Sequence, residues 1–299
     1  MIFRNDNIQL NSDKAKNYIQ LNNEDFQLSS LHDNNYGNKG ASANLFTLID
    51  PSGETEDRVI KICKTPLSSG TNKKIARFKR EIKAFQIASK VPLGNVIHFY
   101  QSGEVEIDGF DFLYIIMEKA DDDLPNYLEK NNFKFTINQK FSFCYSILTG
   151  VKQLHSVKIY HRDIKHDNIL RVNGAFKIGD LGLITFQNKD FDGTNEKIGP
   201  FGWLSPEATN KMLTYKKKIG FNYDCDINNK SDVFQLGKLF WYIFQGNLPI
   251  GQIKEDDSNF NETDIYEVIF EMLQYQKSRR PTIEQVEEKF KPLKQKYNI

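Results

Sequence analysis

Residues 161–168 read His-Arg-Asp-Ile-Lys-His-Asp-Asn, and this stretch decides the fold. Asp180-Leu181-Gly182 begins twelve residues after Asn168. Between them, Asn173-Gly174 favours a tight hairpin turn, because both residues tolerate a positive φ. Before the stretch, apolar residues recur at helical spacing from Phe141 to Leu154. The sequence therefore predicts a helix, a polar loop and a strand hairpin in succession.

The polar side chains of this stretch suit phosphoryl transfer, which depends mainly on alignment and on neutralising negative charge. Asp163 is suited to orient an attacking hydroxyl and accept its proton, and Lys165 to neutralise the transferring group. Asn168 and Asp180 offer the hard oxygen ligands that Mg²⁺ prefers. Each residue alone is also common in ordinary loops, so it is the spaced set that indicates chemistry.

The apolar pattern changes character near residue 119. From residue 26 to 118 it predicts mainly strands, with one helix between Asn72 and Lys90. After Asp121 it is helical, and residues 233–244 are apolar almost all round, which predicts a buried helix.

We therefore expect an α+β, bilobal fold with a ligand cleft between the lobes. Residues 26–118 form the small antiparallel-sheet lobe with one helix, and residues 119–299 form the larger, mainly helical lobe. Residues 1–25 are expected to be an N-terminal extension, with a weak helical pattern from Ala15 to Leu21.

Composition excludes several classes of protein. The 299 residues carry 40 Lys and Arg against 39 Asp and Glu, a net charge of +1, which argues against nucleic acid as a partner. No window approaches 18 consecutive apolar residues, so we expect no membrane span. Three widely spaced cysteines and an N-terminus without a signal-peptide layout favour a cytoplasmic location.

From about Phe26 to Phe290 the chain resembles a eukaryotic-type protein kinase. Residues 58–61, Arg-Val-Ile-Lys, are similar to the strand that carries the family's phosphate-binding lysine. The resemblance implies that Glu81 is the ion-pair partner that holds Lys61 against the α- and β-phosphates of ATP. ATP and Mg²⁺ are the cofactors that follow from it.

Three later motifs favour a protein substrate. Ser205-Pro206-Glu207 stands where the family closes its activation segment, and Arg280 matches the arginine that pairs with Glu207. Asp232 matches the aspartate that braces the catalytic loop. Enzymes of related fold that act on small molecules or lipids usually lack this machinery, which argues against that alternative.

The resemblance also implies a nucleotide pocket. Its expected residues are Gly40 in the phosphate-binding loop, Leu45 and Val59 above the base, Glu118 and Ala120 at its edge, and Leu170 below it. The expected glycine-rich loop departs from the family pattern, because residues 37–45 read Gly-Asn-Lys-Gly-Ala-Ser-Ala-Asn-Leu. Plain core packing explains each aliphatic residue equally well.

The substrate-docking stretch is unusual. Pro200 stands where serine/threonine kinases usually carry Thr, and Trp203 three residues later is more similar to tyrosine kinases. Lys165, however, is the serine/threonine-type residue and acts on the phosphate itself, so we expect phosphorylation of Ser and Thr with Asp163 as base. A dual-specificity or tyrosine kinase and a pseudokinase scaffold remain the alternatives.

Arg162 resembles the arginine that orders the activation loop by binding a phosphate, for which Thr194 is the first candidate site and Thr185 the second. Asp190, Asp192 and Glu196 are acidic and close in sequence, so they are candidates to pair with Arg162 without modification. We therefore expect activity that depends weakly, or not at all, on phosphorylation.

Overall fold

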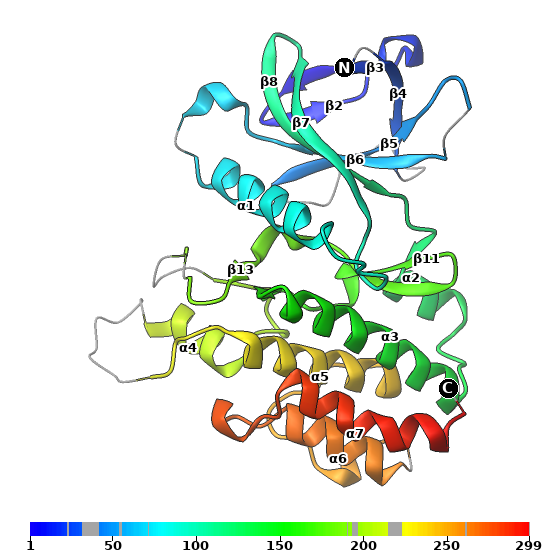
Figure 1. Cartoon of the computed structure of the whole chain (residues 1–299), viewed down its shortest axis with the longest axis vertical. Coiled ribbons are helices and arrows are strands. Elements are labelled where there is room, and N and C mark those ends of the chain that lie inside the picture. Colours follow the sequence, from blue (N-terminus) through cyan, green and yellow to red (C-terminus); the bar gives the residue numbers. More distant parts are fainter. Residues whose placement is uncertain are drawn as a thin grey trace. The chain divides into compact units, whose positions relative to one another are not determined.

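The computed structural model describes residues 1–22, 24–31, 42–53, 56–70, 72–189, 191–192, 197–214, 223–260 and 262–298 (Figure 1). The chain divides into two compact units. The first unit contains Met1–Pro92 and Ile97–Lys119, and the second contains Leu93–Val96 and Ala120–Ile299. The assignment of residues 1–25, 26–118 and 119–299 to an extension and two functional lobes stays a prediction.

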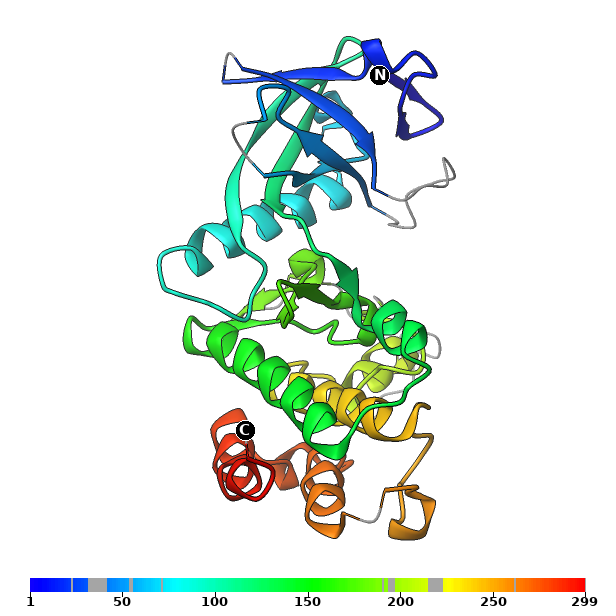
Figure 2. The same cartoon turned by 90° about the vertical axis from the view of Figure 1, so that its right-hand side faces the viewer.

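The first unit is built on an antiparallel sheet of six strands in the order β3-β4-β5-β6-β8-β7. Its strands are β1 (Ile2–Arg4), β2 (Asn7–Gln9), β3 (Tyr18–Leu21), β4 (Glu24–Ser30), β5 (Ala43–Ile49), β6 (Arg58–Cys63), β7 (Phe99–Ile107) and β8 (Phe110–Glu118). Strands β1 and β2 form a separate hairpin (Figure 2). The strands expected in this region are confirmed, and Asp108-Gly109 forms the turn between β7 and β8, where Ile107 pairs with Phe110.

Helix α1 (Lys73–Ala88) is the one α-helix that the described part of this unit contains. Asn72 caps it by accepting a hydrogen bond from the Lys74 N–H at 2.8 Å. The helix buries Phe78 and Phe85, which recur at helical spacing, and Glu81 lies on the same buried face. This packing against β6, β7 and β8 brings a carboxylate to the sheet.

The helical pattern expected from Ala15 to Leu21 is wrong. Residues 14–16 form a single 3₁₀ turn, and Tyr18–Leu21 form the edge strand β3. Ile19 and Leu21 are buried while Tyr18 and Gln20 are exposed, which is the two-residue period of a strand. Residues 18–21 therefore belong to the sheet of the first unit, and the residues before them belong to the same unit.

The second unit is mainly helical. Its helices are α2 (Leu124–Lys130), α3 (Ile137–Ser156), α4 (Pro206–Thr214), α5 (Asn229–Gln245), α6 (Thr263–Met272) and α7 (Ile283–Lys296), and its strands are β9 (Asp122–Asp123), β10 (Ile159–Tyr160), β11 (Ile169–Val172), β12 (Ala175–Ile178) and β13 (Thr185–Phe186). Strands β11 and β12 form the hairpin that Asn173-Gly174 predicts. None of the helices in the described ranges combines the length and the apolarity needed to cross a bilayer.

Helix α5 is the centre of this unit, as the apolar run at 233–244 predicts. It packs between α3 on one side and α6 and α7 on the other (Figures 1 and 2). Its residues are buried nearly all round, including the charged Asp232. Close packing also governs α3, where a Cβ on Gly150 would lie 2.5 Å from the Asn95 carbonyl oxygen.

Candidate active site

Asp232 of α5 accepts hydrogen bonds from the backbone of the loop at 161–168. One carboxylate oxygen accepts the His161 N–H at 2.8 Å, and the other accepts the Arg162 N–H at 2.7 Å. Asp232 is 0% exposed, so these bonds are made where water does not compete. They stabilise Arg162 in a left-handed conformation, with φ of 64°.

Gln235, one turn further along α5, holds the same loop. Its Oε1 accepts the Ile164 N–H at 3.0 Å, and its Nε2 donates to the Arg162 carbonyl at 3.1 Å. Sequence reasoning missed this residue. The available signal was an amide in a helix that is otherwise apolar on nearly every side.

Asp163 and Asn168 are brought together inside this loop. The Asn168 amide Nδ2 donates to the Asp163 carbonyl at 2.8 Å and to Asp163 Oδ2 at 3.0 Å. The other carboxylate oxygen, Oδ1, is buried and has no hydrogen-bond partner among the described residues. One oxygen of Asp163 is therefore fixed, and the other is left to accept a proton or a hydrogen bond.

Burial raises the pKa of Asp163 to about 6, although the nearby charges of Lys165 and His161 lower it. The negative charge of Asp180 raises it further, so the two carboxylates are close enough to interact. Lys165 is partly buried, with its Nζ 3.4 Å from Asp167 Oδ2. A carboxyl with this pKa is mostly ionised at pH 7 and still a competent base.

The hairpin β11–β12 places Asp180 next to Asn168. Gly179, the residue before Asp180, donates its N–H to the Asn168 carbonyl at 2.8 Å, and its own carbonyl lies 2.9 Å from His161 Nε2. Asp180 has φ of 49° and accepts a hydrogen bond from the Gly182 N–H at 3.2 Å. A left-handed aspartate is a locally costly conformation, which is typical of functional loops.

These donors fit a divalent cation of the magnesium type. Because Nδ2 of Asn168 is engaged with Asp163, its amide oxygen faces away from that carboxylate. Within the described ranges no three His, Cys, Asp or Glu side chains gather as a metal site. A cation here would therefore rely on one amide oxygen, one carboxylate and the phosphates of a nucleotide, as Mg²⁺ often does.

Lys61 and Glu81 form an ion pair within the first unit. Lys61 Nζ lies 2.7 Å from Glu81 Oε1, and both side chains are buried. Strand β6 supplies the lysine and helix α1 the glutamate, as the sequence predicts. Burial without a partner would be costly for either charge, so the pair fixes α1 against β6.

The residues expected around the base fall in both units. In the first unit, Leu45 on β5 is half-buried and pairs with Lys61, and Val59 on β6 is buried and pairs with Met117. In the second unit, Ala120 and Leu170 are half-buried. The Glu118 N–H donates to the His98 carbonyl at 3.0 Å, so this N–H is engaged within the first unit. Gly40 lies outside the described residues, and the nucleotide role of this set stays a prediction.

The expected anchor of the activation segment is present. Arg280 donates to both carboxylate oxygens of Glu207, at 2.7 and 2.8 Å, and Ser231 Oγ donates to the same carboxylate at 2.5 Å. Burial alone would raise the pKa of Glu207, but the hydrogen bonds and charge of Arg280 lower it overall. The charge pair thus joins α4 to the segment before α7.

One of the acidic partners expected for Arg162 is confirmed. Its guanidinium forms a buried ion pair with Asp192, and its Nε donates to the Leu183 carbonyl at 2.8 Å. Asp190, Thr194 and Glu196 lie outside the described residues. An unmodified carboxylate therefore already pairs with Arg162.

Comparisons with known proteins agree with this geometry. The family model described as protein kinase domain matches residues 39–297. The chain is 28% identical over 245 residues to the sensor for unfolded proteins in the ER ire1 of Schizosaccharomyces pombe, covering 69% of this chain and 22% of that protein. It is 29% identical over 181 residues to the serine/threonine-protein kinase PrkC of Bacillus subtilis, covering 60% and 25%.

A third relative is the dual specificity protein kinase TTK of Mus musculus, 27% identical over 146 residues, with coverage of 48% of this chain and 16% of that protein. The chain thus spans a quarter or less of the length of these relatives. The matched family model covers most of its residues and includes every element of the site above. The chain belongs to the protein kinase family.

Proposed function

We propose that the chain transfers the γ-phosphoryl group of ATP to Ser and Thr hydroxyls of proteins, with Asp163 as the catalytic base. The observation that carries this proposal is the buried Oδ1 of Asp163, which has no hydrogen-bond partner within the described chain. A substrate hydroxyl would supply that partner. The raised pKa of Asp163, about 6, suits a group that takes a proton near neutral pH.

The other residues provide charge. Lys61, held by Glu81, would bind the α- and β-phosphates, and Lys165 would offset the charge of the transferring group. Asn168 and Asp180 would hold Mg²⁺, which supplies charge neutralisation on the phosphate oxygens when bound. No group has to form a covalent bond to the chain, so positioning and electrostatics carry the reaction.

The environment of Trp203 supports Ser/Thr specificity. Its ring is buried and packs edge-on against His166 of the catalytic loop, with centroids 5.0 Å apart, and it also contacts Tyr242. Core packing thus accounts for this tryptophan without tyrosine recognition. Lys165 then remains the residue that bears most directly on specificity.

The test is transfer of radiolabel from [γ-³²P]ATP to a protein mixture, followed by phosphoamino-acid analysis, with Asp163→Asn as control. We expect phosphoserine and phosphothreonine with the wild type and at least a hundredfold less transfer with the variant, in line with the usual worth of a general base, about 10²–10⁴-fold. Mainly phosphotyrosine would contradict the specificity. Binding of Mg·ATP without any transfer would instead identify a pseudokinase. The cytoplasmic location stays a prediction.

A further inference from the structure

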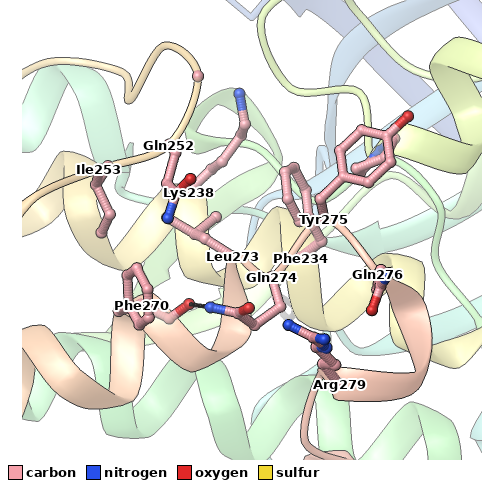
Figure 3. Close-up of a pocket in the computed structure, with 12 residues that line it drawn as sticks. Phe234, Lys238, Gln252, Ile253, Phe270, Leu273, Gln274, Tyr275, Gln276 and Arg279 are labelled. Atoms are coloured by element: carbon pink, nitrogen blue, oxygen red, sulfur yellow. Dashed lines mark hydrogen bonds between the residues drawn. The ribbon is translucent and has the colours of Figure 1, made fainter.

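A cavity of about 540 Å³ lies in the second unit, apart from the residues of the site above (Figure 3). Its walls come from the first residue of α4, from α5, from the loop before α6, from the end of α6 and from the segment that follows α6, and they include Phe234, Lys238, Ile253, Phe270, Tyr275 and Arg279. Figure 3 shows Phe234 and Tyr275 on one side of the pocket and Ile253 on the opposite side. Its volume is that of a ligand pocket, about 300–1,000 Å³.

Lys238 brings a poorly compensated positive charge into this cavity. Its Nζ donates to the Gly202 carbonyl at 2.6 Å and to the Pro249 carbonyl at 3.2 Å, and no carboxylate of the described residues pairs with it. An ammonium group has three N–H donors, so one remains for a ligand. Burial lowers the pKa of Lys238, which means that its charge is under-stabilised in the absence of an anion.

The rest of the lining strengthens this preference for an anion. Arg279 also faces the cavity and is exposed, and its guanidinium has no ion-pair partner in the described part of the chain. None of the described residues that line the cavity is Asp or Glu. The described lining therefore combines two cationic side chains with an apolar wall and contains no acidic group that would repel a carboxylate.

Exposed apolar side chains lie among the lining residues, or next in sequence to a lining residue or to a partner of Lys238. Tyr275 is 68% exposed, Ile250 beside the lining residue Gly251 is 94% exposed, and Phe201 beside Gly202 is 69% exposed. A small carboxylate would leave these side chains in water. A polypeptide would cover them, so the surface favours a peptide over a free small molecule.

We propose that this cavity binds a short acidic segment of a protein substrate. An aromatic or aliphatic side chain of the segment occupies the apolar wall of Phe234, Ile253 and Phe270, and the carboxylates on its two sides bind Lys238 and Arg279, which lie at opposite ends of the pocket in Figure 3. The identification of the partner as a substrate rests on the proposed kinase function, whereas the binding of an acidic segment does not depend on that function.

The first experiment measures binding alone, with the full chain carrying Asp163→Asn so that no phosphate is transferred. The probe is a fluorescein-labelled decapeptide with a central Trp flanked by Asp, and the control peptide has Lys in place of Asp. Fluorescence anisotropy should show saturable binding of the Asp peptide, and about tenfold weaker binding of the Lys peptide.

Added Lys238→Met or Arg279→Gln should weaken binding of the Asp peptide by about tenfold. Lys291→Met, on α7 and outside the cavity, is the matched control and should have no effect. Arg279 is exposed, so its variant keeps the test valid even if Lys238→Met disturbs the loop at Gly202. Any of three results would overturn the proposal. They are equal affinity for the Asp and Lys peptides, unchanged affinity for the Asp peptide in both cavity variants, and tighter binding of dodecanoate than of the Asp peptide.

The second experiment measures turnover with the wild type. A phosphorylatable peptide joined to the Asp-Trp-Asp segment should have a KM about tenfold below that of the peptide alone, with similar kcat. Tyr275→Ser should abolish this difference, whereas Tyr18→Ser, at an exposed tyrosine of the first unit, should retain it. An unchanged KM would refute recruitment of substrates. Loss of all turnover with intact peptide binding would count against the kinase function and leave the binding site supported.

Discussion

Replacing Asp163 with Asn is expected to stabilise the folded chain at pH 8, because it removes a buried charge. Burial raises the pKa of Asp163 from the ordinary value of 3.8 to about 6. Between these pH values the folded state keeps the proton, whereas the unfolded state has released it. The contribution of Asp163 to stability is therefore fully present below the unfolded pKa of 3.8 and is lost as the pH rises through 6. At about 1.4 kcal/mol for each pH unit, the loss is roughly 3 kcal/mol.

Urea unfolding at pH 4 and at pH 8, monitored by tryptophan fluorescence, measures this effect. At pH 8 Asp163→Asn should exceed the wild type in free energy of unfolding by up to about 3 kcal/mol. At pH 4 the advantage should be much smaller, because the wild-type carboxyl is then protonated in the folded state. The Asn168 amide can still donate to the new side-chain oxygen, so little else changes.

Asp167→Asn is the matched control in the same loop. A hydrogen bond from His166 lowers the pKa of Asp167, so its stabilising contribution is present above the unfolded pKa and lost as the pH falls. This variant should therefore be slightly less stable than the wild type at pH 8. If Asp163→Asn gave the same difference from the wild type at both pH values, burial would not be what sets the Asp163 pKa.

Three further predictions concern packing and charge. Glu207→Gln should destabilise the fold by about 3–5 kcal/mol in urea unfolding, because it leaves the buried Arg280 without its anion. Gly150→Ala should destabilise it by about 1–3 kcal/mol, since the new Cβ would meet the Asn95 carbonyl and the cost exceeds the gain in helix propensity. Asp192→Asn should lower kcat in the radiolabel assay by about tenfold, a barrier increase of about 1.4 kcal/mol, because it removes an anionic partner of a buried guanidinium.

Each of these changes has a control. Glu288→Gln removes an exposed carboxylate and should cost less than about 1 kcal/mol. Gly94→Ala places its Cβ in open space and should have little effect. Thr194→Ala should lower kcat less than Asp192→Asn does. Inactivity of the Thr194 variant with full activity of the Asp192 variant would show that a phosphate, and not the carboxylate, orders the segment.

Much of the fold follows from short-range pattern. Strand β6 and helices α1 and α5 appear where the apolar periodicity predicts them. The buried positions of each element must be apolar, so they recur in the sequence with the period of that element. The error at Ala15–Leu21 arose where few apolar residues are available and helical and strand periods are hard to distinguish. Ala15, Tyr18 and Ile19 fit the spacing of a helix, whereas Ile19 and Leu21 fit the two-residue period of a strand, and pairing with β4 decided the outcome.

The polar site was predictable in part. Asp163, Asn168 and Asp180 lie close in sequence, so the loop and hairpin that join them were readable. The roles of Gln235 and Lys238 were not, because their partners are backbone carbonyls and N–H groups from distant segments. Such contacts depend on tertiary packing and leave only an unexplained polar residue in an apolar helix.

The spacing of Asp232, Gln235 and Lys238 gives α5 a wider importance. The first two hold the backbone of the loop that carries Asp163, and the third holds Gly202, which follows Pro200. Helix α5 thereby sets how far Asp163 stands from the segment around Gly202. Any substitution that rotates or shifts α5 should therefore change turnover and substrate choice together. The two properties would then be difficult to change independently during evolution.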